Sequence, residues 1–298
     1  MPEIIPIGGG KGGVGKSFIA ANAGALIAKR GYRVVLVDLD LGGPNTHTFL
    51  GLKNPKGGTG SYLNKAAKTL EEAAVPTPFP NLFFVGSNHC SMEIANLYHA
   101  QKLKLINGIK ALSFDFVILD LGAGTNFNTL DFFLISDKGI FICTPEPTSV
   151  ENSFRFIKAV YLRRLKQNIE LSSYQKILKQ AAPDPGNIVE TALKFDPKLE
   201  MRLRETIRRF QFGFIINQLR ASNTSLGGHI ETACNRHFYS KFKFLGNVNF
   251  DERVPESIFK KTLFALRYPD AVASQALNGI CDALIHESGH DMNKAKTR

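Results

Sequence analysis

The stretch "GGGKGGVGKSF", residues 8–18, decides the fold of this 298-residue chain. A short apolar run at 3–7 precedes it and predicts a strand, whereas the small and apolar residues of 17–29 predict a helix. The spacing G-x-x-x-x-G-K-[ST] is met by Gly10, Gly15, Lys16 and Ser17. Because this spacing falls between a predicted strand and a predicted helix, it indicates a loop that binds phosphate groups.

The chemistry of such a loop follows from its residue types. Glycines allow backbone N–H groups to surround an oxyanion, and the start of the helix adds a positive dipole. We expect Lys16 to contact the β- and γ-phosphates of a nucleotide and the Ser17 hydroxyl to bind Mg²⁺. The alternative, a glycine-rich turn that binds nothing, is disfavoured by the strand and helix on either side. The predicted nucleotide contacts in this loop are Gly10, Lys11, Gly12, Gly13, Val14, Gly15, Lys16, Ser17 and Phe18.

Six further short runs of β-branched or aromatic residues follow along the chain. They span 33–38, 81–86, 114–120, 139–144, 212–217 and 244–248. Their nearly continuous apolar character indicates strands that are covered on both faces, as in a parallel sheet. Because helical patterns lie between them, we predict an α/β fold with a doubly wound, mostly parallel sheet and helices on both faces.

A long interval before the run at 212–217 departs from this rhythm. The apolar residues of two predicted helical faces are Phe154, Ile157, Tyr161 and Leu165, and Leu199, Leu203, Ile207 and Phe210. "AAPDPGN" at 181–187 separates them. We therefore expect a helical insertion at about 150–210, packed on a single domain of residues 1–286, and a flexible polar tail at 287–298.

The positive charge of the chain is concentrated in this insertion. The formal net charge is +11, and residues 155–209 hold 13 Lys or Arg against 6 Asp or Glu, a net +7. A solvated helical face explains this excess, because Lys and Arg are ordinary surface residues of helices. We favour that explanation over a surface for an acidic protein partner or for non-specific contacts with DNA phosphates, which stays the alternative.

Composition limits the compartment and the kinds of cofactor. The cysteines are Cys90, Cys143, Cys234 and Cys281. They are scattered without a CxxC pair, so we interpret them as small core residues. No run approaches the roughly 20 apolar residues of a membrane span, and the first residues do not resemble an export signal, so we expect a cytoplasmic protein.

Three aspartates follow predicted strands. Asp38 and Asp40 lie at and just beyond the end of one strand, and Asp120 ends another. Because the carboxyl ends of parallel strands meet at one edge of a sheet, all three should converge on the glycine-rich loop. Carboxylates there can bind Mg²⁺ with its waters or orient an attacking water, although a lone aspartate is often only a helix cap.

These segments together resemble a known family. "KGGVGKS" is similar to the deviant Walker A loop of the MinD/ParA ATPases, a branch of the P-loop NTPases. "DLDLGGPN" and "DLGAG" resemble the switch I and switch II segments of that family. The likeness extends over nearly the whole chain except the insertion, and "DLGAGTNFNTLDFF" is most similar to the FlhG group, also called FleN or YlxH, which is MinD-like.

The resemblance implies roles for the loop and the carboxylates. Lys11 would be the signature lysine that crosses the interface of an ATP-bound homodimer and contacts the partner's nucleotide. Asp40 would position or activate the hydrolytic water, and Asp38 would support the loop near the metal. Asp120 would bind the magnesium shell through water. The implied catalytic residues are Lys11, Lys16 and Asp40, and the implied metal site comprises Ser17, Asp38, Asp40 and Asp120.

The resemblance also implies a site for the base. Asn217, at the end of a late strand, matches the adenine-reading asparagine of the family, and its amide offers both a donor and an acceptor. A simple turn residue is the alternative for Asn217. Asp251 and Val254 fall in the segment that commonly flanks the base.

The implied function is an ATP-binding and ATP-hydrolysing switch that dimerises with ATP. It would regulate the cellular position or number of an assembly, as flagellar regulators do. A DNA-associated segregation ATPase of ParA type, or an ATPase of another assembly complex, remains open. No iron–sulfur cluster is expected because the cysteine patterns of those relatives are missing, and no membrane-targeting helix is expected at the C-terminus because the final helix, about 270–285, leads into polar residues.

Overall fold

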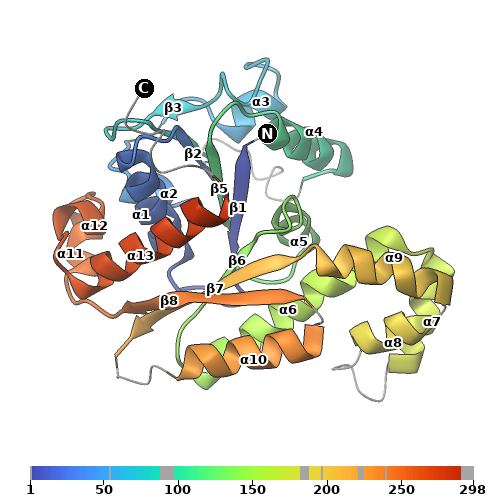
Figure 1. The fold of residues 1–298 in the computed structure, drawn as a ribbon. Helices are drawn as coiled ribbons and strands as arrows, with labels where there is room; N and C mark the ends of the chain where they lie inside the picture. The colour runs from blue at the N-terminus through green and yellow to red at the C-terminus, as the bar shows by residue number, and fades with distance from the viewer. Residues whose placement is uncertain are drawn as a thin grey trace.

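One mixed β-sheet forms the centre of the computed structural model (Figure 1). The model describes residues 2–53, 55–87, 97–181, 188–195, 197–220, 225–238 and 240–289. Within these residues the eight strands have the order β3-β4-β2-β5-β1-β6-β7-β8. The strands are β1 (Glu3–Gly8), β2 (Val34–Leu39), β3 (Val75–Pro76), β4 (Leu82–Val85), β5 (Phe116–Leu121), β6 (Ile140–Cys143), β7 (Gln211–Leu219) and β8 (Lys241–Asn249).

All seven predicted strands are confirmed, and they pair in parallel. The remaining strand, β3, pairs antiparallel with β4 at the edge of the sheet. The sequence did not predict β3 because it has two residues and one of them, Pro76, has no N–H for a strand ladder. An edge position tolerates that loss, so β3 closes this side of the sheet.

Helices cover both faces of the sheet, as predicted (Figure 1). On β2, Val34 and Leu36 belong to one apolar cluster and Val35 and Val37 to the other, because successive strand side chains point to opposite faces. One face is covered by α1 (Lys16–Lys29), α2 (Thr46–Phe49), α11 (Val254–Phe259), α12 (Phe264–Arg267) and α13 (Val272–Glu287). The other is covered by α3 (Thr59–Leu63), α4 (His99–Lys110), α5 (Phe127–Phe133), α6 (Pro147–Asn168) and α10 (Leu226–Phe238).

The strand order brings the predicted site residues together. β5 lies between β1 and β2, so the loop after β1 adjoins the ends of both aspartate-bearing strands. Asp38 on β2 and Asp120 on β5 are register partners, and Asp120 also pairs with Ile7 on β1. The carboxyl edge of the sheet therefore gathers the glycine-rich loop and two buried carboxylates.

The predicted helical insertion is present between β6 and β7. It consists of α6 followed by α7 (Leu171–Ala181), α8 (Ile188–Phe195) and α9 (Pro197–Arg208). Figure 1 shows α7, α8 and α9 extending beyond the edge of the sheet. Ile177, Leu193 and Leu203 are buried and join the apolar cluster that also contains the inner side of α6.

Parts of these expectations lie outside the described residues. The structure does not describe the break at 182–187, the side chain of Leu199, Cys90 or the tail segment 290–298. The division into a domain of 1–286 and a tail of 287–298 stays a prediction. Cys143, Cys234 and Cys281 are buried, as expected. Among the described helices, none has the length and apolar character needed to cross a bilayer.

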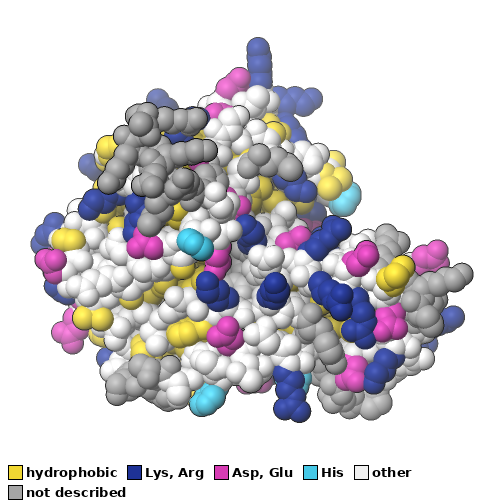
Figure 2. Space-filling view, in the orientation of Figure 1, with side chains coloured by type: hydrophobic (Ala, Val, Ile, Leu, Met, Phe, Trp, Pro, Cys, Tyr) yellow, Lys and Arg dark blue, Asp and Glu magenta, His cyan; other side chains and the backbone are white. Residues whose placement is uncertain are grey.

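Internal ion pairs involve part of the positive charge of the insertion. Arg163 contacts Asp131 and Arg164 contacts Asp137, both outside the insertion. Within the helices, ion pairs link Arg155 to Glu151, Lys194 to Glu190 and Arg204 to Glu200. In Figure 2, Lys and Arg side chains over this part of the molecule are interspersed with Asp and Glu. Part of the positive charge counted from the sequence is therefore neutralised by ion pairs within the fold.

Candidate functional site

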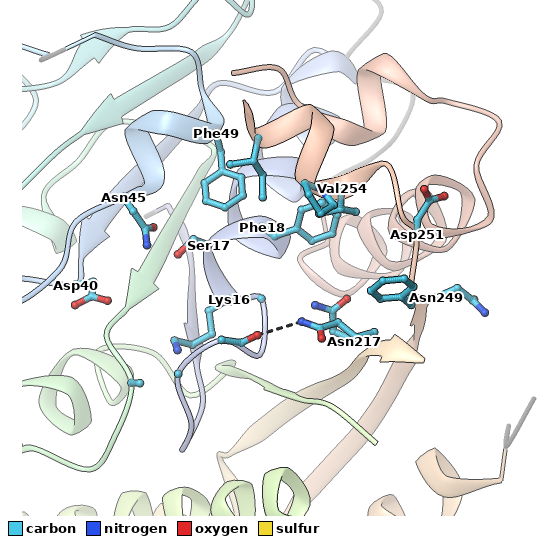
Figure 3. Close-up of a pocket in the computed structure, with 18 residues that line it drawn as sticks. Lys16, Ser17, Phe18, Asp40, Asn45, Phe49, Asn217, Asn249, Asp251 and Val254 are labelled. Atoms are coloured by element: carbon cyan, nitrogen blue, oxygen red, sulfur yellow. Dashed lines mark hydrogen bonds between the residues drawn. The ribbon is translucent and has the colours of Figure 1, made fainter. Parts of the chain in front are cut away.

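A cavity of about 400 Å³, here called the main cavity, lies at the carboxyl edge of the sheet (Figure 3). Lys16 and Asp40 lie toward one end of it, and Asn217, Asn249 and Asp251 toward the other. Its lining comprises Gly12, Gly13, Gly15, Lys16, Ser17, Phe18, Asp40, Asn45, Phe49, Ala123, Asn217, Gln218, Asn249, Phe250, Asp251, Val254, Pro255 and Ile258. Most of the predicted contact residues are therefore brought to one place.

Close packing fixes the shape of the glycine-rich loop. Gly15 has a φ of 92°, and a Cβ there would lie 2.1 Å from Nδ2 of Asn217. A Cβ on Gly10 would lie 2.0 Å from the backbone oxygen of Asn152 on α6. Both positions require glycine, because a side chain would displace the loop from β7 or from α6.

Lys16 is buried within this loop, with 8% of its surface exposed. Its Nζ donates to the backbone oxygen of Lys11 at 3.4 Å. Burial lowers the pKa of Lys16, and the nearby Asp120 and Asp40 partly restore it. An anion bound in the loop would favour the charged ammonium and so oppose the effect of burial.

Asp38 holds the segment that follows β2. Its carboxylate is fully buried and accepts hydrogen bonds from the backbone N–H groups of Asp40 at 3.0 Å and Thr46 at 3.3 Å. Burial raises the pKa of Asp38, and the charge of Asp120 raises it further. Because both carboxylate oxygens have backbone donors, the geometry favours loop support over direct metal binding.

Asp120 is buried with one oxygen unsatisfied. Its Oδ2 accepts a hydrogen bond from the Thr46 hydroxyl, whereas its Oδ1 has no hydrogen-bond partner among the described residues. Burial raises the pKa of Asp120, and the hydrogen bond from Thr46 and the nearby Ser17 hydroxyl oppose the rise. An orphaned, buried carboxylate oxygen is uncommon in folded proteins and fits a site completed by a metal-bound water.

The fit to Mg²⁺ follows from this donor set. No group of three or more His, Cys, Asp or Glu in the described part of the chain could by itself enclose a metal. Mg²⁺ is typically held by one or two protein oxygens together with substrate phosphates and waters, so it needs no such cage. The Ser17 hydroxyl and the free Asp120 oxygen fit that arrangement.

Asp40 lies between two hollows. It lines the main cavity and also a second hollow of about 540 Å³, the side hollow, whose walls include Leu41, Leu97 and Asn126. Gly122 lies against it, since a Cβ on that glycine would be 3.1 Å from Oδ1 of Asp40. Asp40 can therefore reach both the phosphate loop and the space beside it.

Lys11 is exposed at the surface of the loop, in contrast to Lys16. The pKa of the nearby Glu146 is lowered most by a hydrogen bond from Thr144. The positive charge of Lys11 lowers it further. The two lysines of one loop therefore have different surroundings, one inside the site and one outside.

The other end of the main cavity contains the predicted base contacts. Asn217 is 4% exposed, and its Nδ2 donates to the backbone oxygen of Val14 at 2.9 Å. Asp251 forms an ion pair with Arg253, whose hydrogen bonds lower the pKa of Asp251. Val254 begins α11 and lines the cavity. Asn217 thus contacts the loop as well as the predicted base site.

Sequence reasoning missed much of this wall. The unpredicted lining residues are Asn45, Phe49, Ala123, Gln218, Asn249, Phe250, Pro255 and Ile258. They come from loops and short helices that carry no motif. Asn249 ends β8 and Phe250 follows it, and this position at the carboxyl edge of the sheet is the signal that could have found two of them.

Comparisons with known proteins agree with this geometry. The profile of the CobQ/CobB/MinD/ParA nucleotide binding domain matches residues 5–264. The septum site-determining protein MinD of Synechocystis is 32% identical over 159 residues, covering 53% of this chain and 59% of that protein. The flagellum site-determining protein YlxH of Helicobacter pylori is 31% identical over 167 residues, covering 52% of this chain and 53% of that protein.

A solved structure supports the fold over nearly the full length. The septum site-determining protein MinD of Pyrococcus horikoshii, complexed with Mg-ADP, superposes with a TM-score of 0.67 at 20% identity, covering 97% of this chain and 98% of that chain. The alignments with the curated relatives span about half the length of those proteins. Because the family profile matches most of the sequence, the chain belongs to the CobQ/CobB/MinD/ParA family of nucleotide-binding domains, and its fold is that of the MinD/ParA P-loop NTPases.

Proposed function

We propose that this chain, as a member of the CobQ/CobB/MinD/ParA family, is an ATPase that switches between a monomer and an ATP-bound homodimer. One observation carries the proposal. The charges of Asp120 and Asp40 act on the buried Lys16, and the buried Asp120 keeps one oxygen without a hydrogen-bond partner among the described residues. An excess of charged groups without partners is unfavourable in a protein interior, unless a ligand with phosphates and a cation completes the site.

The triphosphate would lie along the glycine-rich loop. Backbone N–H groups from Gly12 to Ser17 and the start of α1 would surround the phosphate oxygens. Lys16 would then exchange its bond to the Lys11 oxygen for a charged bond to the β- and γ-phosphates. Ser17 and, through water, Asp120 would hold Mg²⁺, which when bound neutralises charge on the phosphates.

Hydrolysis breaks the bond between the γ-phosphorus and the bridging oxygen and gives ADP and phosphate. Asp40 is suited to orient the attacking water because it borders both the main cavity and the side hollow. Asp38 would keep Asp40 in place through the backbone hydrogen bond between them. In this scheme Lys16 and Asp40 act on the reacting groups, whereas Asp38 positions them.

Lys11 would act in the neighbouring protomer. Its exposed side chain suits a contact across a dimer interface. A second cation at the γ-phosphate stabilises the charge that develops during transfer, and supplying it from a partner makes turnover depend on association. Loss of the γ-phosphate would then release the dimer.

At the other end of the cavity, Asn217 would read the adenine edge, and Asp251 and Val254 would flank the base. The apolar side chains of Phe49, Pro255 and Ile258 supply a surface for the ring.

The cellular role that we propose is cytoplasmic regulation of where, or how many times, an assembly is built. The similarity to the flagellum site-determining protein YlxH of Helicobacter pylori supports this output. A ParA-type role on DNA is the second candidate, since the basic residues of α6 to α9 could contact phosphates. The ion pairs of Arg155, Lys194 and Arg204 count against it, because they reduce the charge available to a polyanion.

Three variants test the mechanism against one control. Lys16→Ala should weaken ATP binding by at least about 100-fold because it removes a buried charged contact. Asp40→Ala should bind ATP, stop phosphate release and accumulate dimers in sedimentation, whereas Lys11→Ala should bind ATP and stay monomeric. The control is Lys29→Ala, because Lys29 is exposed at the far end of α1, the helix that begins with Lys16. This variant should behave as wild type. Normal phosphate release by Asp40→Ala, or ATP-dependent dimers of Lys11→Ala, would contradict the assigned roles.

A further inference from the structure

The end of β7 departs from regular strand geometry. The β7–β8 register shifts between Asn217 and Leu219, and Gln218 has a φ of 60°, in the left-handed region. In a regular strand, successive side chains point to opposite faces. Here both neighbours reach the same loop: Asn217 donates to the Val14 oxygen at 2.9 Å, and Gln218 Nε2 donates to the Gly13 oxygen at 3.1 Å.

This conformation is unfavourable for glutamine. Left-handed backbone brings Cβ close to the following carbonyl, and glycine, asparagine and aspartate are the residues that usually tolerate it. In the described part of the chain, the non-glycine residues with positive φ are Lys65, Asn81, Gln218 and Lys261. Of these, Gln218 lines the main cavity. Backbone strain at a residue that lines a cavity is typical of functional sites, so it points to a role for Gln218.

The loop segment that Gln218 contacts has little other packing. Lys11, Gly12 and Gly13 are exposed, and a Cβ on Gly12 or Gly13 would meet no described residue within 4 Å. By contrast, Gly10 and Gly15 on either side lie tightly against α6 and Asn217. A hydrogen bond to the Gly13 oxygen therefore restrains the part of the loop that its neighbours leave free.

We infer that Gln218 is a positioning residue that holds the outer half of the glycine-rich loop in the shape that receives the β- and γ-phosphates. The inference rests on the proposed function, because it assumes that the loop binds a nucleotide. Gln218 and Asn217 are adjacent amides, and they connect the base end of the main cavity to two consecutive carbonyl groups of the loop. The same restraint fixes the backbone from which Lys11 extends.

The first test separates strain from positioning. Gln218→Gly removes both the side-chain tether and the backbone strain, so the thermal midpoint should rise by about 2–4 °C. The dissociation constant for ATP should nevertheless increase about three- to tenfold, as expected for one lost hydrogen bond, while that for AMP stays unchanged. Lys65→Gly, at an exposed residue with a φ of 64°, should raise the midpoint similarly and leave both affinities unchanged.

The second test uses a variant that keeps the size of the side chain. Gln218→Glu replaces the donor by a carboxylate that repels the Gly13 oxygen, so it should weaken ATP binding at least as much as Gln218→Gly. In the nucleotide-free protein, hydrogen exchange at the amides of residues 11–14 should accelerate in both variants and not in Lys65→Gly.

Several outcomes would overturn the inference. ATP affinity within twofold of wild type in both Gln218 variants would show that the tether positions nothing. Equal weakening of ATP and AMP would assign Gln218 to the base instead. If the wild-type protein bound no ATP, the proposed function would fail, yet unchanged exchange of the loop amides in the variants would still refute the tether separately.

Discussion

Two buried carboxylate sites of this protein differ in how their charge is balanced. The loop of residues 122–126, between β5 and α5, separates them in the sequence. Asp38 and Asp120 at the strand ends have raised pKa values because they are buried, and the charge of Asp120 raises the pKa of Asp38 further. Asp131, on α5 just after that loop, is also buried. Burial opposes its ionisation as well, but hydrogen bonds from Arg163 and Lys102 outweigh that effect and lower its pKa.

The donors around Asp131 come from two other helices. Lys102 on α4 contacts Oδ2, Arg163 on α6 contacts both oxygens at 2.6 and 2.8 Å, and Gln167 on α6 donates at 3.0 Å. Asp120 has one oxygen with no such donor within the described residues. Burial alone therefore does not mark a functional carboxylate. An oxygen without a donor does, because a complete internal network leaves no place for a ligand.

The largest expected effect tests the balanced site. Asp131→Ala leaves the buried Lys102 without its counter-charge, so we expect the free energy of unfolding to fall by about 3–5 kcal/mol in a denaturant titration. Asp131→Ala with Lys102→Met should recover part of this loss, because the second change removes the uncompensated ammonium. A loss below about 1 kcal/mol in the single variant would mean that the network is not a structural clamp.

A change of opposite sign is expected at the unbalanced site. Burial raises the pKa of Asp120 and so disfavours its ionised form in the fold, so Asp120→Asn should stabilise the nucleotide-free protein by about 1–2 kcal/mol. The same variant should lower ATP turnover about 10–100-fold, because Asp120 would orient a water of the metal shell. If the unfolding free energy instead decreases, Asp120 is a structural carboxylate like Asp131 and the contrast between the two sites is lost.

Acid titration should distinguish Asp131 from a neutral replacement. Because its folded pKa is lowered, ionised Asp131 contributes stability above the unfolded pKa of about 4, and this contribution is lost as the pH falls through the folded pKa. The difference in unfolding free energy between wild type and Asp131→Asn should therefore be constant near neutral pH and shrink below pH about 4. Denaturant titrations from pH 7 to pH 3 measure it, and a difference that does not vary with pH would contradict the ion pair.

The smallest effect is expected at an exposed pair on the same helix. Arg155 and Glu151 form an ion pair with side chains 69% and 61% exposed. Arg155→Ala should change the unfolding free energy by no more than about 0.5 kcal/mol, since water screens such a pair. A larger loss would show that α6 depends on its outer charges as well as on Arg163.

Local sequence patterns predicted the elements whose signal lies within a few residues. The strand that ends in Asp120 is apolar at nearly every position because both of its faces are buried, and the loop before Lys16 has a spacing that few other structures require. These features placed the sheet, the loop and the two carboxylates together. The direction of the chain through a doubly wound sheet then determined which edge carries the site.

The rest depends on contacts between distant residues. Arg163 counts as a surface charge in the sequence, yet in the fold it pairs with Asp131 on another helix. Gln218 has no local signal for a left-handed backbone, because glycine or asparagine would be expected there. Asn45 and Phe49 reach the main cavity only through the path of the segment after β2. Such positions are set by packing and not by period or propensity.

The contact between Gly10 and Asn152 has a mechanical consequence. With its 22 residues, α6 is a rod about 33 Å long, whose first turns touch the phosphate loop and whose far end carries α7. Because Gly10 is already in close contact with Asn152, the loop cannot move toward α6 unless the helix tilts. A tilt at the first turns of α6 produces a larger displacement at its far end. A spin label or fluorophore on the exposed Gln175 of α7 would then report movement of the glycine-rich loop without altering any residue of that loop.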